Sequence, residues 1–248
     1  MPRRTTEVAR SIRLTLLGGF TLLEDAEEIV LPLSAQRLVA LLALHERPMS
    51  RACVAGTLWP DCSADRSLAD LRTALWRANH SRVAVVEIAG ISLSLRRGVT
   101  VDVRELSAFG RATVGLATAN AIRELAGISW PELSLDLLPD WYDDWLLDER
   151  ERLRQLRLHA LEGLTHELSL GGRHAAAIQA ALAAVRLEPL RETAHAALIK
   201  AYLAEGNRSE ALRQFRRCQE ILADGLAVEP SESLRQLVVS PPWLSAAS

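Results

Sequence analysis

A spacing of 34 residues in the second half of the chain constrains its fold more than any other feature. It recurs at three pairs of positions: Gly172 and Gly206, Ala177 and Ala211, Ile178 and Leu212. Thirty-four residues is the period of TPR helical hairpins, in which small residues let paired helices approach closely. The spacing therefore predicts an all-α, TPR-like region, with a generic helical bundle as the alternative.

Long helical patterns interrupted by glycine and proline surround this repeat. Leucines at helical spacing predict a helix from Trp141 to Leu170, which ends at Gly171-Gly172. Three further helices are predicted over 173–187, 191–205 and 208–226. A helix over 103–114 and a connecting loop over 126–139 precede them.

The first hundred residues mix short strands with short helices. Strands are predicted at 12–17, 20–23 and 29–31, and a hairpin at 83–88 and 91–95 around Ala89-Gly90. Helices are predicted to begin at Ser34, at Ser50, and at Ser63 or Asp65, since Ser and Asp cap helix N-termini. Strands, three helices and a hairpin are the order of a winged helix-turn-helix.

The predicted architecture is mainly α with a small β component. A winged helix-turn-helix over 11–104 is followed by a TPR-like helical domain over 105–240. The third helix of the first domain then takes the place of a recognition helix.

The third helix carries the side chains that we expect to contact DNA. With Leu68, Leu71, Leu75 and Ala78 turned inward, the outward arc holds a second set of residues. These are Arg66, Ala69, Thr73, Trp76, Arg77 and His80, with Arg72 at the flank. Arginine binds guanine edges through two hydrogen bonds and also binds phosphate. A solvated amphipathic helix is the alternative, but position in the winged-helix order favours DNA contact.

Three further arginines are candidates for phosphate contacts. Arg96 and Arg97 follow the hairpin, and Arg51 opens the second helix, where a helix N-terminus attracts anions. The net charge of the chain is −2. The segment from Arg66 to Arg97 nevertheless contains six arginines and just two carboxylates, Asp70 and Glu87. Codon usage in a GC-rich genome accounts for the preference for arginine over lysine without any function.

No motif of a known enzyme class occurs in the chain. A P-loop, GxGxxG, HExxH and GxSxG are all absent, so neither an enzyme nor a cofactor is expected. His159 and His166 lie seven residues apart on one helix, a poor geometry for a metal. The carboxylates among residues 140–148 suit a helix N-terminus better than acid–base chemistry. The three cysteines fit no metal pattern and are expected to be reduced and mostly buried.

A cytoplasmic protein that does not enter a membrane is expected. No stretch of about 20 apolar residues occurs, as a membrane helix requires. Residues 1–10 are polar and basic, and no apolar segment of a signal peptide follows them.

Four stretches resemble the SARP-type transcriptional regulators, which join an OmpR-type winged helix to a bacterial transcriptional activator domain. Residues 31–61, ending in Leu-Trp-Pro-Asp, resemble the first two helices of that winged helix. "DLRTALWRANH" at 70–80 resembles its recognition helix. Residues 137–164, from "LLPDWYDDW", and residues 183–237 resemble the activator domain.

The chain departs from the family in three places. Ala78-Asn79-His80 replaces a basic Leu-Arg-Arg run, which removes positive charge where DNA contacts are expected. Residues 104–131 match loosely. No nucleotide-binding ATPase domain follows, so the chain resembles the short, stand-alone members.

The resemblance implies a transcription activator that binds direct repeats in double-stranded DNA as a homodimer or tandem pair. It further implies that the loop at 60–64 touches RNA polymerase holoenzyme and that the activator domain mediates self-association or receives a signal. The alternative hypothesis is a TPR-like protein-interaction regulator with weak or lost DNA binding, based on Ala78-Asn79-His80 and the low net charge.

Overall fold

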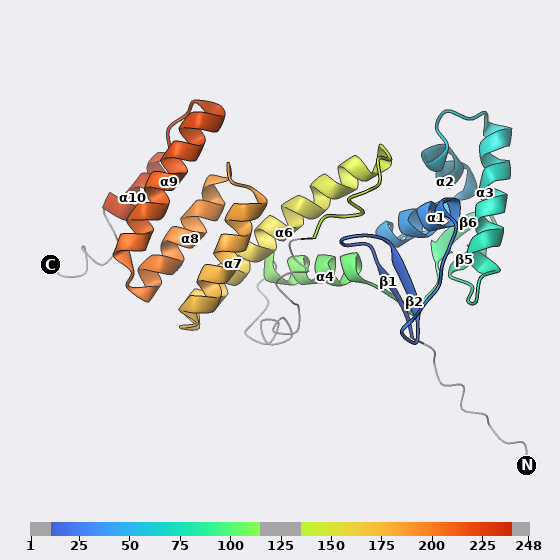
Figure 1. Ribbon diagram of the computed structural model, residues 1–248, viewed down its shortest axis with the longest axis horizontal. Coiled ribbons are helices and arrows are strands. Elements are labelled where there is room, and N and C mark those ends of the chain that lie inside the picture. The colour runs from blue at the N-terminus through green and yellow to red at the C-terminus, as the bar shows by residue number, and fades with distance from the viewer. Residues whose placement is uncertain (1–10, 115–134, 240–248) are drawn as a thin grey trace, which may run out of the picture. The chain divides into compact units, whose positions relative to one another are not determined.

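The computed structural model describes residues 11–114 and 135–239 (Figure 1). It divides into two compact units, which we treat separately. Of the described residues, the first comprises 11–106 together with 135–150, and the second comprises 107–114 and 151–239. The predicted fold class, a winged helix followed by a TPR-like helical region, is confirmed. The predicted domain ranges of 11–104 and 105–240 stay predictions.

A four-stranded sheet in the order β3-β2-β1-β7 begins the first unit. Its strands are β1 (Ile12–Thr15), β2 (Thr21–Glu24), β3 (Glu27–Glu28) and β7 (Val99–Val101). β7 runs parallel to β1, a pairing that the sequence patterns did not predict. The third strand was expected at 29–31 and lies earlier, because Asp25 and Ala26 take positive φ angles and form a tight turn.

Three helices and a second, small sheet complete the winged helix (Figure 1). The helices are α1 (Leu33–Leu44), α2 (Arg51–Leu58) and α3 (Ala64–Asn79). The sheet has the order β4-β6-β5, formed by Met49–Ser50, Ser92–Leu95 and Val86–Ala89. Ser50 caps α2 as predicted, since its hydroxyl accepts from Cys53 N. Ser34 does not cap α1, which begins one residue earlier behind Pro32.

Arg104, near the start of α4 (Asp102–Val114), closes the C-terminal end of α1. Its Nε donates to the carbonyl of Ala43 (2.7 Å), and its Nη2 donates to the carbonyls of Leu42 (3.1 Å) and His45 (3.0 Å). The last carbonyls of a helix lack intrahelical partners, and a cation suits this negative end of the helix dipole. Burial lowers the pKa of Arg104 from its ordinary value.

Residues 135–150, which lie beyond the predicted winged helix, pack within the same unit. The backbone N–H of Leu138 donates to Leu16 O (2.9 Å), and that of Gly18 donates to Asp136 O (2.8 Å). Leu137, Leu138 and Leu146 are buried. The segment therefore contributes both a β-bridge and apolar surface to this unit.

Two arginines fix this segment in place. Arg150 donates from its guanidinium to the carbonyls of Leu137, Leu138 and Trp141. Arg37 on α1 pairs with Asp143. The helix predicted from Trp141 consequently begins at Trp145, as α6 (Trp145–Leu170), and Asp148 is the one predicted acidic residue that lies in its first turn.

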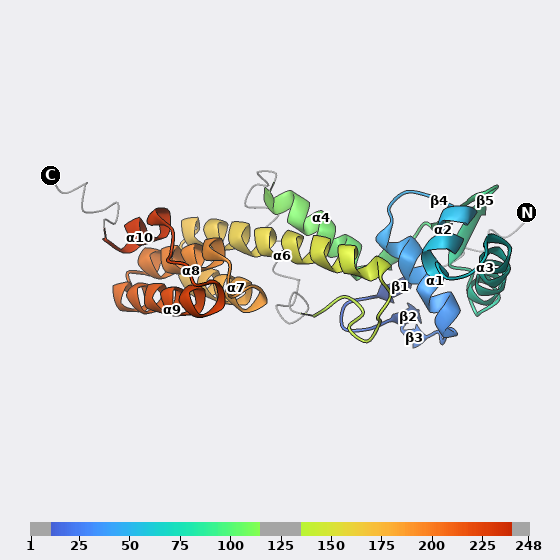
Figure 2. The ribbon, with the colours of Figure 1, turned by 90° about the horizontal axis from the view of Figure 1, so that it is seen from above.

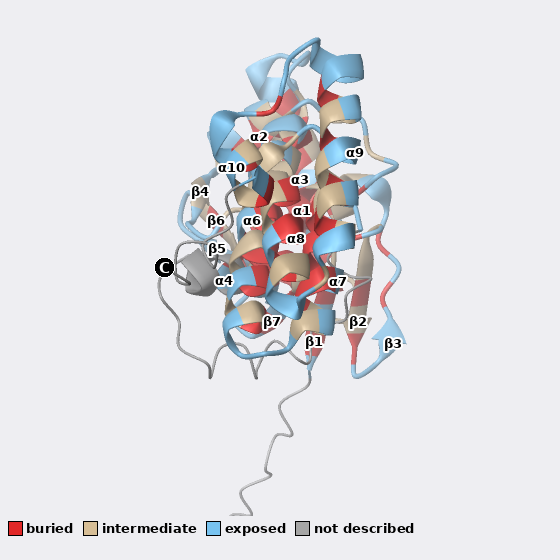
Figure 3. Ribbon diagram, turned by 90° about the vertical axis from the view of Figure 1, so that its left-hand side faces the viewer, coloured by how far each residue is buried: buried red, intermediate tan, exposed pale blue. Residues whose placement is uncertain are grey.

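The second unit consists of antiparallel helices (Figures 1 and 2). α7 (His174–Leu187) packs against α8 (Glu192–Glu205), and α8 packs against α9 (Arg208–Leu226). A helix that was not predicted, α10 (Glu232–Val239), packs on both α8 and α9. Buried positions line the contacts between these helices and are red in Figure 3.

The 34-residue repeat has a direct structural basis. Gly172 and Gly206 both end a helical segment with a positive φ, which glycine adopts without steric cost. Ala177 and Ala211 are both fully buried, where a larger side chain would hold the helices apart. The predicted TPR-like register is thus the observed one.

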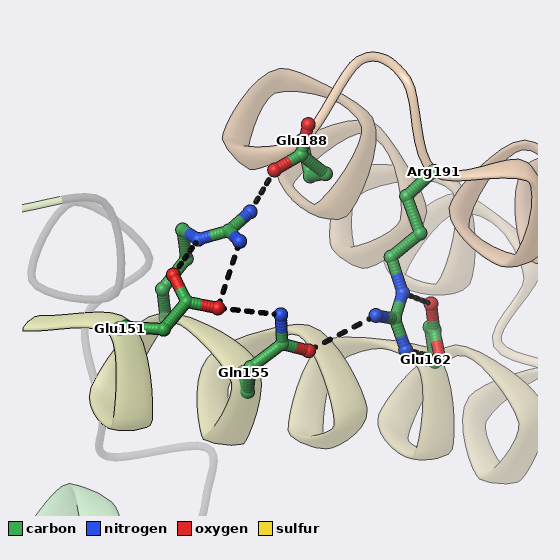
Figure 4. Close-up of polar contacts among 6 residues, drawn as sticks. Glu151, Gln155, Glu162, Glu188 and Arg191 are labelled. Carbon is green, nitrogen blue, oxygen red and sulfur yellow. Dashed lines mark hydrogen bonds and ion pairs between the residues drawn. The ribbon is translucent and has the colours of Figure 1, made fainter. Parts of the chain in front are cut away.

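An ion-pair network ties α6 to the connection between α7 and α8 (Figure 4). Arg191 donates to Glu162 (2.8 Å) and to Gln155 (3.1 Å), and Arg154 pairs with Glu188. These side chains are partly buried, so the network is screened less by salt than a surface pair.

His195 is buried between α8 and α9 with both ring nitrogens bonded. Nε2 lies 2.8 Å from Pro189 O, and Nδ1 lies 2.7 Å from Gln214 Nε2. A neutral ring that donates from Nε2 and accepts at Nδ1 satisfies both partners. Burial lowers the pKa of His195 below its ordinary value of 6.5.

Replacement of Arg104 by Ala should lower the free energy of unfolding of the first unit by about 2–4 kcal/mol, because three carbonyls lose their donor. Urea denaturation of the full chain measures this change. Arg13→Ala is the control, because its ion pair with Glu105 is half exposed and is worth about 0–1 kcal/mol. Equal effects of the two substitutions would contradict the role of Arg104.

Acidification should destabilise the second unit through His195. The unfolded chain takes up a proton as the pH falls through about 6.5, whereas the folded chain holds the ring neutral to lower pH. Stability is therefore complete above that pH and is lost below it. His195→Leu should flatten the difference in urea midpoint between about pH 7.5 and about pH 5.5. An unchanged difference in the variant would sink this account.

Candidate nucleic-acid interface

α3 buries one side and exposes the other, as its periodicity predicts. Its fully buried residues are Ser67, Leu71, Ala74, Leu75 and Ala78. Ser67 donates to Ala64 O, so its hydroxyl is satisfied in the core. Leu68, placed in the apolar stripe from sequence, is half-buried at its edge.

The structure brings six of the seven predicted α3 residues to one solvent-facing surface, and the seventh, Ala69, is half-buried. The exposed residues are Arg66, Arg72, Thr73, Trp76, Arg77 and His80. We call these six residues the α3 face. An exposed fraction of 60% for Trp76 is large for an indole, and burial of this ring against a partner would be favourable.

Several side chains of the α3 face are held by neighbours. Trp76 and His80 stack with their ring centroids 4.8 Å apart. Arg77 donates to Ser34 Oγ (3.2 Å), and Arg66 pairs with Asp70 (3.3 Å). Arg72 makes no ion pair with any residue in the described ranges. The α3 face therefore combines a stacked aromatic pair with arginines that differ in whether a neighbouring side chain already binds them.

The hairpin β5–β6 forms the wing beside α3. Arg96 and Arg97 follow β6 and are exposed, as predicted. Arg96 donates to Ala84 O (3.3 Å), which leaves its charge uncompensated. Arg82, before the hairpin, instead pairs with Glu24 and Glu27, which raise its pKa. Arg96 and Arg97 are thus the better-placed wing cations.

Arg51 lies at the first turn of α2, where two of the backbone amides are already occupied. Its own N–H donates to Ile91 O (2.9 Å), and that of Cys53 donates to Ser50 Oγ (3.2 Å). An anion at this end would therefore depend on the half-exposed Arg51 side chain. The thiol of Cys53 is exposed, and so is that of Cys62, contrary to the expectation that most cysteines are buried.

The Ala78-Asn79-His80 departure has structural causes. Ala78 is fully buried, so a long cation at this position would displace the core. Asn79 donates from Nδ2 to Val86 O (2.9 Å) and accepts at Oδ1 from Val86 N (2.9 Å). Asn79 therefore fixes the wing to the end of α3, a positioning role that its residue type alone did not reveal.

A model of the family "Bacterial transcriptional activator domain" matches residues 105–239, more than half of the chain. The chain belongs to this family. The resemblance to SARP-type transcriptional regulators is thereby confirmed.

Two curated relatives of this activator-domain chain are named "Regulatory protein AfsR". The one from Streptomyces griseus is 25% identical over 244 residues, 92% of this chain. The one from Streptomyces coelicolor is 27% identical over 93% of this chain. The chain spans 24% of the length of each. Both relatives are named as regulatory proteins.

A solved structure shares the fold. "Mycobacterium tuberculosis EmbR in complex with low affinity phosphopeptide" matches with a TM-score of 0.66 and 24% identity. The match covers 92% of this chain and 64% of that chain.

Membrane-spanning helices and metal-binding clusters are both absent from the described residues. Among the described helices, none is long and apolar enough to cross a bilayer. Within the same ranges, no group of three or more His, Cys, Asp or Glu residues is placed to hold a metal ion.

Asn79→Ala should release the wing from α3. Loss of both hydrogen bonds to Val86 should cost about 1–3 kcal/mol and speed hydrogen exchange at the Val86 amide. Exchange measured by NMR on the full chain tests this. His80→Ala at the neighbouring exposed position is the control, and equal acceleration in both variants would contradict the clamp.

Proposed function

We propose that this transcriptional regulator activates transcription by binding double-stranded DNA through its winged helix. The observation that carries the proposal is the α3 face, where six of the seven predicted residues are exposed on one side of a helix whose other side is core. A helix with such a face fits the major groove, where arginine distinguishes guanine from other bases.

The wing supports the same proposal. Arg96 and Arg97 are exposed beside α3 and carry no ion pair among the described residues. They would contact phosphate, while Arg66, Arg72, Thr73, Trp76, Arg77 and His80 would face base edges and sugar–phosphate. Backbone contacts fix the register of a protein on DNA, and base contacts give it specificity.

Assembly and activation complete the proposal. The chain would bind direct repeats upstream of a promoter as a homodimer or a tandem pair, since paired modules match paired half-sites. The loop at residues 60–64 would contact RNA polymerase holoenzyme, and the TPR-like unit would mediate self-association or respond to a signal. A cytoplasmic location follows from these partners.

The alternative, a protein-interaction regulator without DNA binding, loses part of its basis. It depended on Ala78-Asn79-His80 and on the low net charge, but Ala78 is core and Asn79 holds the wing, which leaves exposed His80 and the net charge as its grounds. Neither Ala78 nor Asn79 presents an unbonded side chain to solvent. The departure from the family at these two positions therefore removes little positive charge from the α3 face.

Arg72→Ala should weaken binding to the chain's own promoter region about 5- to 100-fold, because a charged contact to base or phosphate is lost. Arg77→Ala should act in the same direction. Fluorescence anisotropy at several salt concentrations measures the effect, and higher salt should weaken the wild-type chain steeply.

Arg216→Ala on α9 is the matched control, because Arg216 is exposed on the second unit. It should leave DNA affinity unchanged. Wild-type binding that does not respond to salt, or equal losses in all three variants, would overturn the assignment of the α3 face.

A further inference from the structure

A pocket of about 330 Å³ lies in the first unit, and no residue of the α3 face lines it. Residues 57–62, from the end of α2 and the loop after it, form one wall. Residues 142–145, which lead into the first residue of α6, form the other, with Arg37 between them. We call this the loop pocket. It joins two segments that lie about eighty residues apart in the sequence.

The loop pocket carries an excess of negative charge. Asp143 is neutralised by its ion pair with Arg37. Asp61 and Asp144 are exposed and form no ion pair with any described residue. Two uncompensated carboxylates at the rim of one pocket attract a cation and repel phosphate, so nucleic acid is a poor occupant.

Aromatic rings line the same pocket. Trp59 and Trp145 are half-buried, and Tyr142 is 92% exposed. A single exposed aromatic side chain is ordinary at a protein surface, so Tyr142 matters here as part of the pocket lining. Aromatic faces attract ammonium and guanidinium groups, most strongly where water is partly excluded.

Two N–H donors at the pocket wall lack an acceptor. The indole Nε1 of Trp145 and the Nε of Arg37 have no hydrogen-bond partner within the described part of the chain. Both atoms are buried from solvent, so they belong to the interior of the wall and are not contacts for an occupant of the pocket.

We propose that the loop pocket binds an arginine or lysine side chain on a peptide segment of a partner protein. Asp61 and Asp144 hold the cation, and Tyr142 and Trp145 cover its aliphatic stem. The inference rests on the proposed function for the identity of the partner, because the loop at 60–64 is the part that would contact RNA polymerase. The inference adds that the segment of RNA polymerase at this contact is basic.

Titration of the full-length chain with Nα-acetyl-arginine amide tests the pocket directly. The tryptophan indole N–H signals in ¹⁵N–¹H spectra report on Trp59 and Trp145, once each is assigned with a Trp→Phe variant. These two signals should shift and saturate, while the uncharged Nα-acetyl-citrulline amide of the same shape should leave them unmoved.

The double variant Asp61→Asn, Asp144→Asn should weaken arginine-amide binding at least about fivefold, as expected for a lost charge-assisted contact. Asp140→Asn is the control, since Asp140 is exposed but does not line the pocket. Equal shifts with the citrulline analogue would overturn the proposal. So would unchanged binding in the double variant, and circular dichroism verifies its fold.

Failure of this inference is distinguishable from failure of the proposed function, because the titration contains no DNA. In reconstituted transcription from the target promoter, the double variant should activate at least about fivefold less at unchanged DNA affinity. Full activation by the double variant would overturn the role of the pocket while leaving DNA recognition by α3 intact.

Discussion

Guanidinium groups bonded to backbone carbonyls hold the first unit together. Arg104 closes the end of α1, and Arg150 binds three carbonyls of the segment before α6. Arg37 joins the end of α2 to Asp143. Arginine suits this role because its planar fork presents five donors and keeps its charge when partly buried. Without these contacts, the carbonyls where helices and loops end would be buried without partners.

Local patterns predicted the second unit well. Gly172, Gly206, Ala177 and Ala211 act through turn geometry and helix spacing, which depend on residues close in sequence. The sequence analysis missed β7 because this strand has only three residues. It is stabilised by parallel pairing with β1, which lies almost ninety positions away in the sequence. The return of residues 135–150 to the first unit was missed for the same reason. The contacts of this segment with Leu16 and Arg37 produce no periodic pattern in the sequence.

For the candidate interface, periodicity identified which residues of α3 are exposed, since a helix places side chains about every 100°. It did not reveal which charges are already compensated. Arg82 resembles Arg97 in sequence, yet Glu24 and Glu27 pair with it. Periodicity correctly placed Ala78 in the core, but the family pattern treated Ala78 and Asn79 as lost DNA contacts, whereas Asn79 holds the wing. Exposure was thus predictable, and the partners of exposed groups were not.

In the DNA complex proposed above, the carboxylates that pair with Arg66 (Asp70) and with Arg82 (Glu24 and Glu27) would compete with the DNA backbone. Four other arginines between 66 and 97 have no such pairing among the described residues: Arg72, Arg77, Arg96 and Arg97. Each phosphate contact releases condensed counterions, with a slope of about −0.9 in log affinity against log salt. Four contacts give a slope of about −4 per protomer, whereas six would give about −5. Internal carboxylates thereby set how many counterions a bound chain can displace.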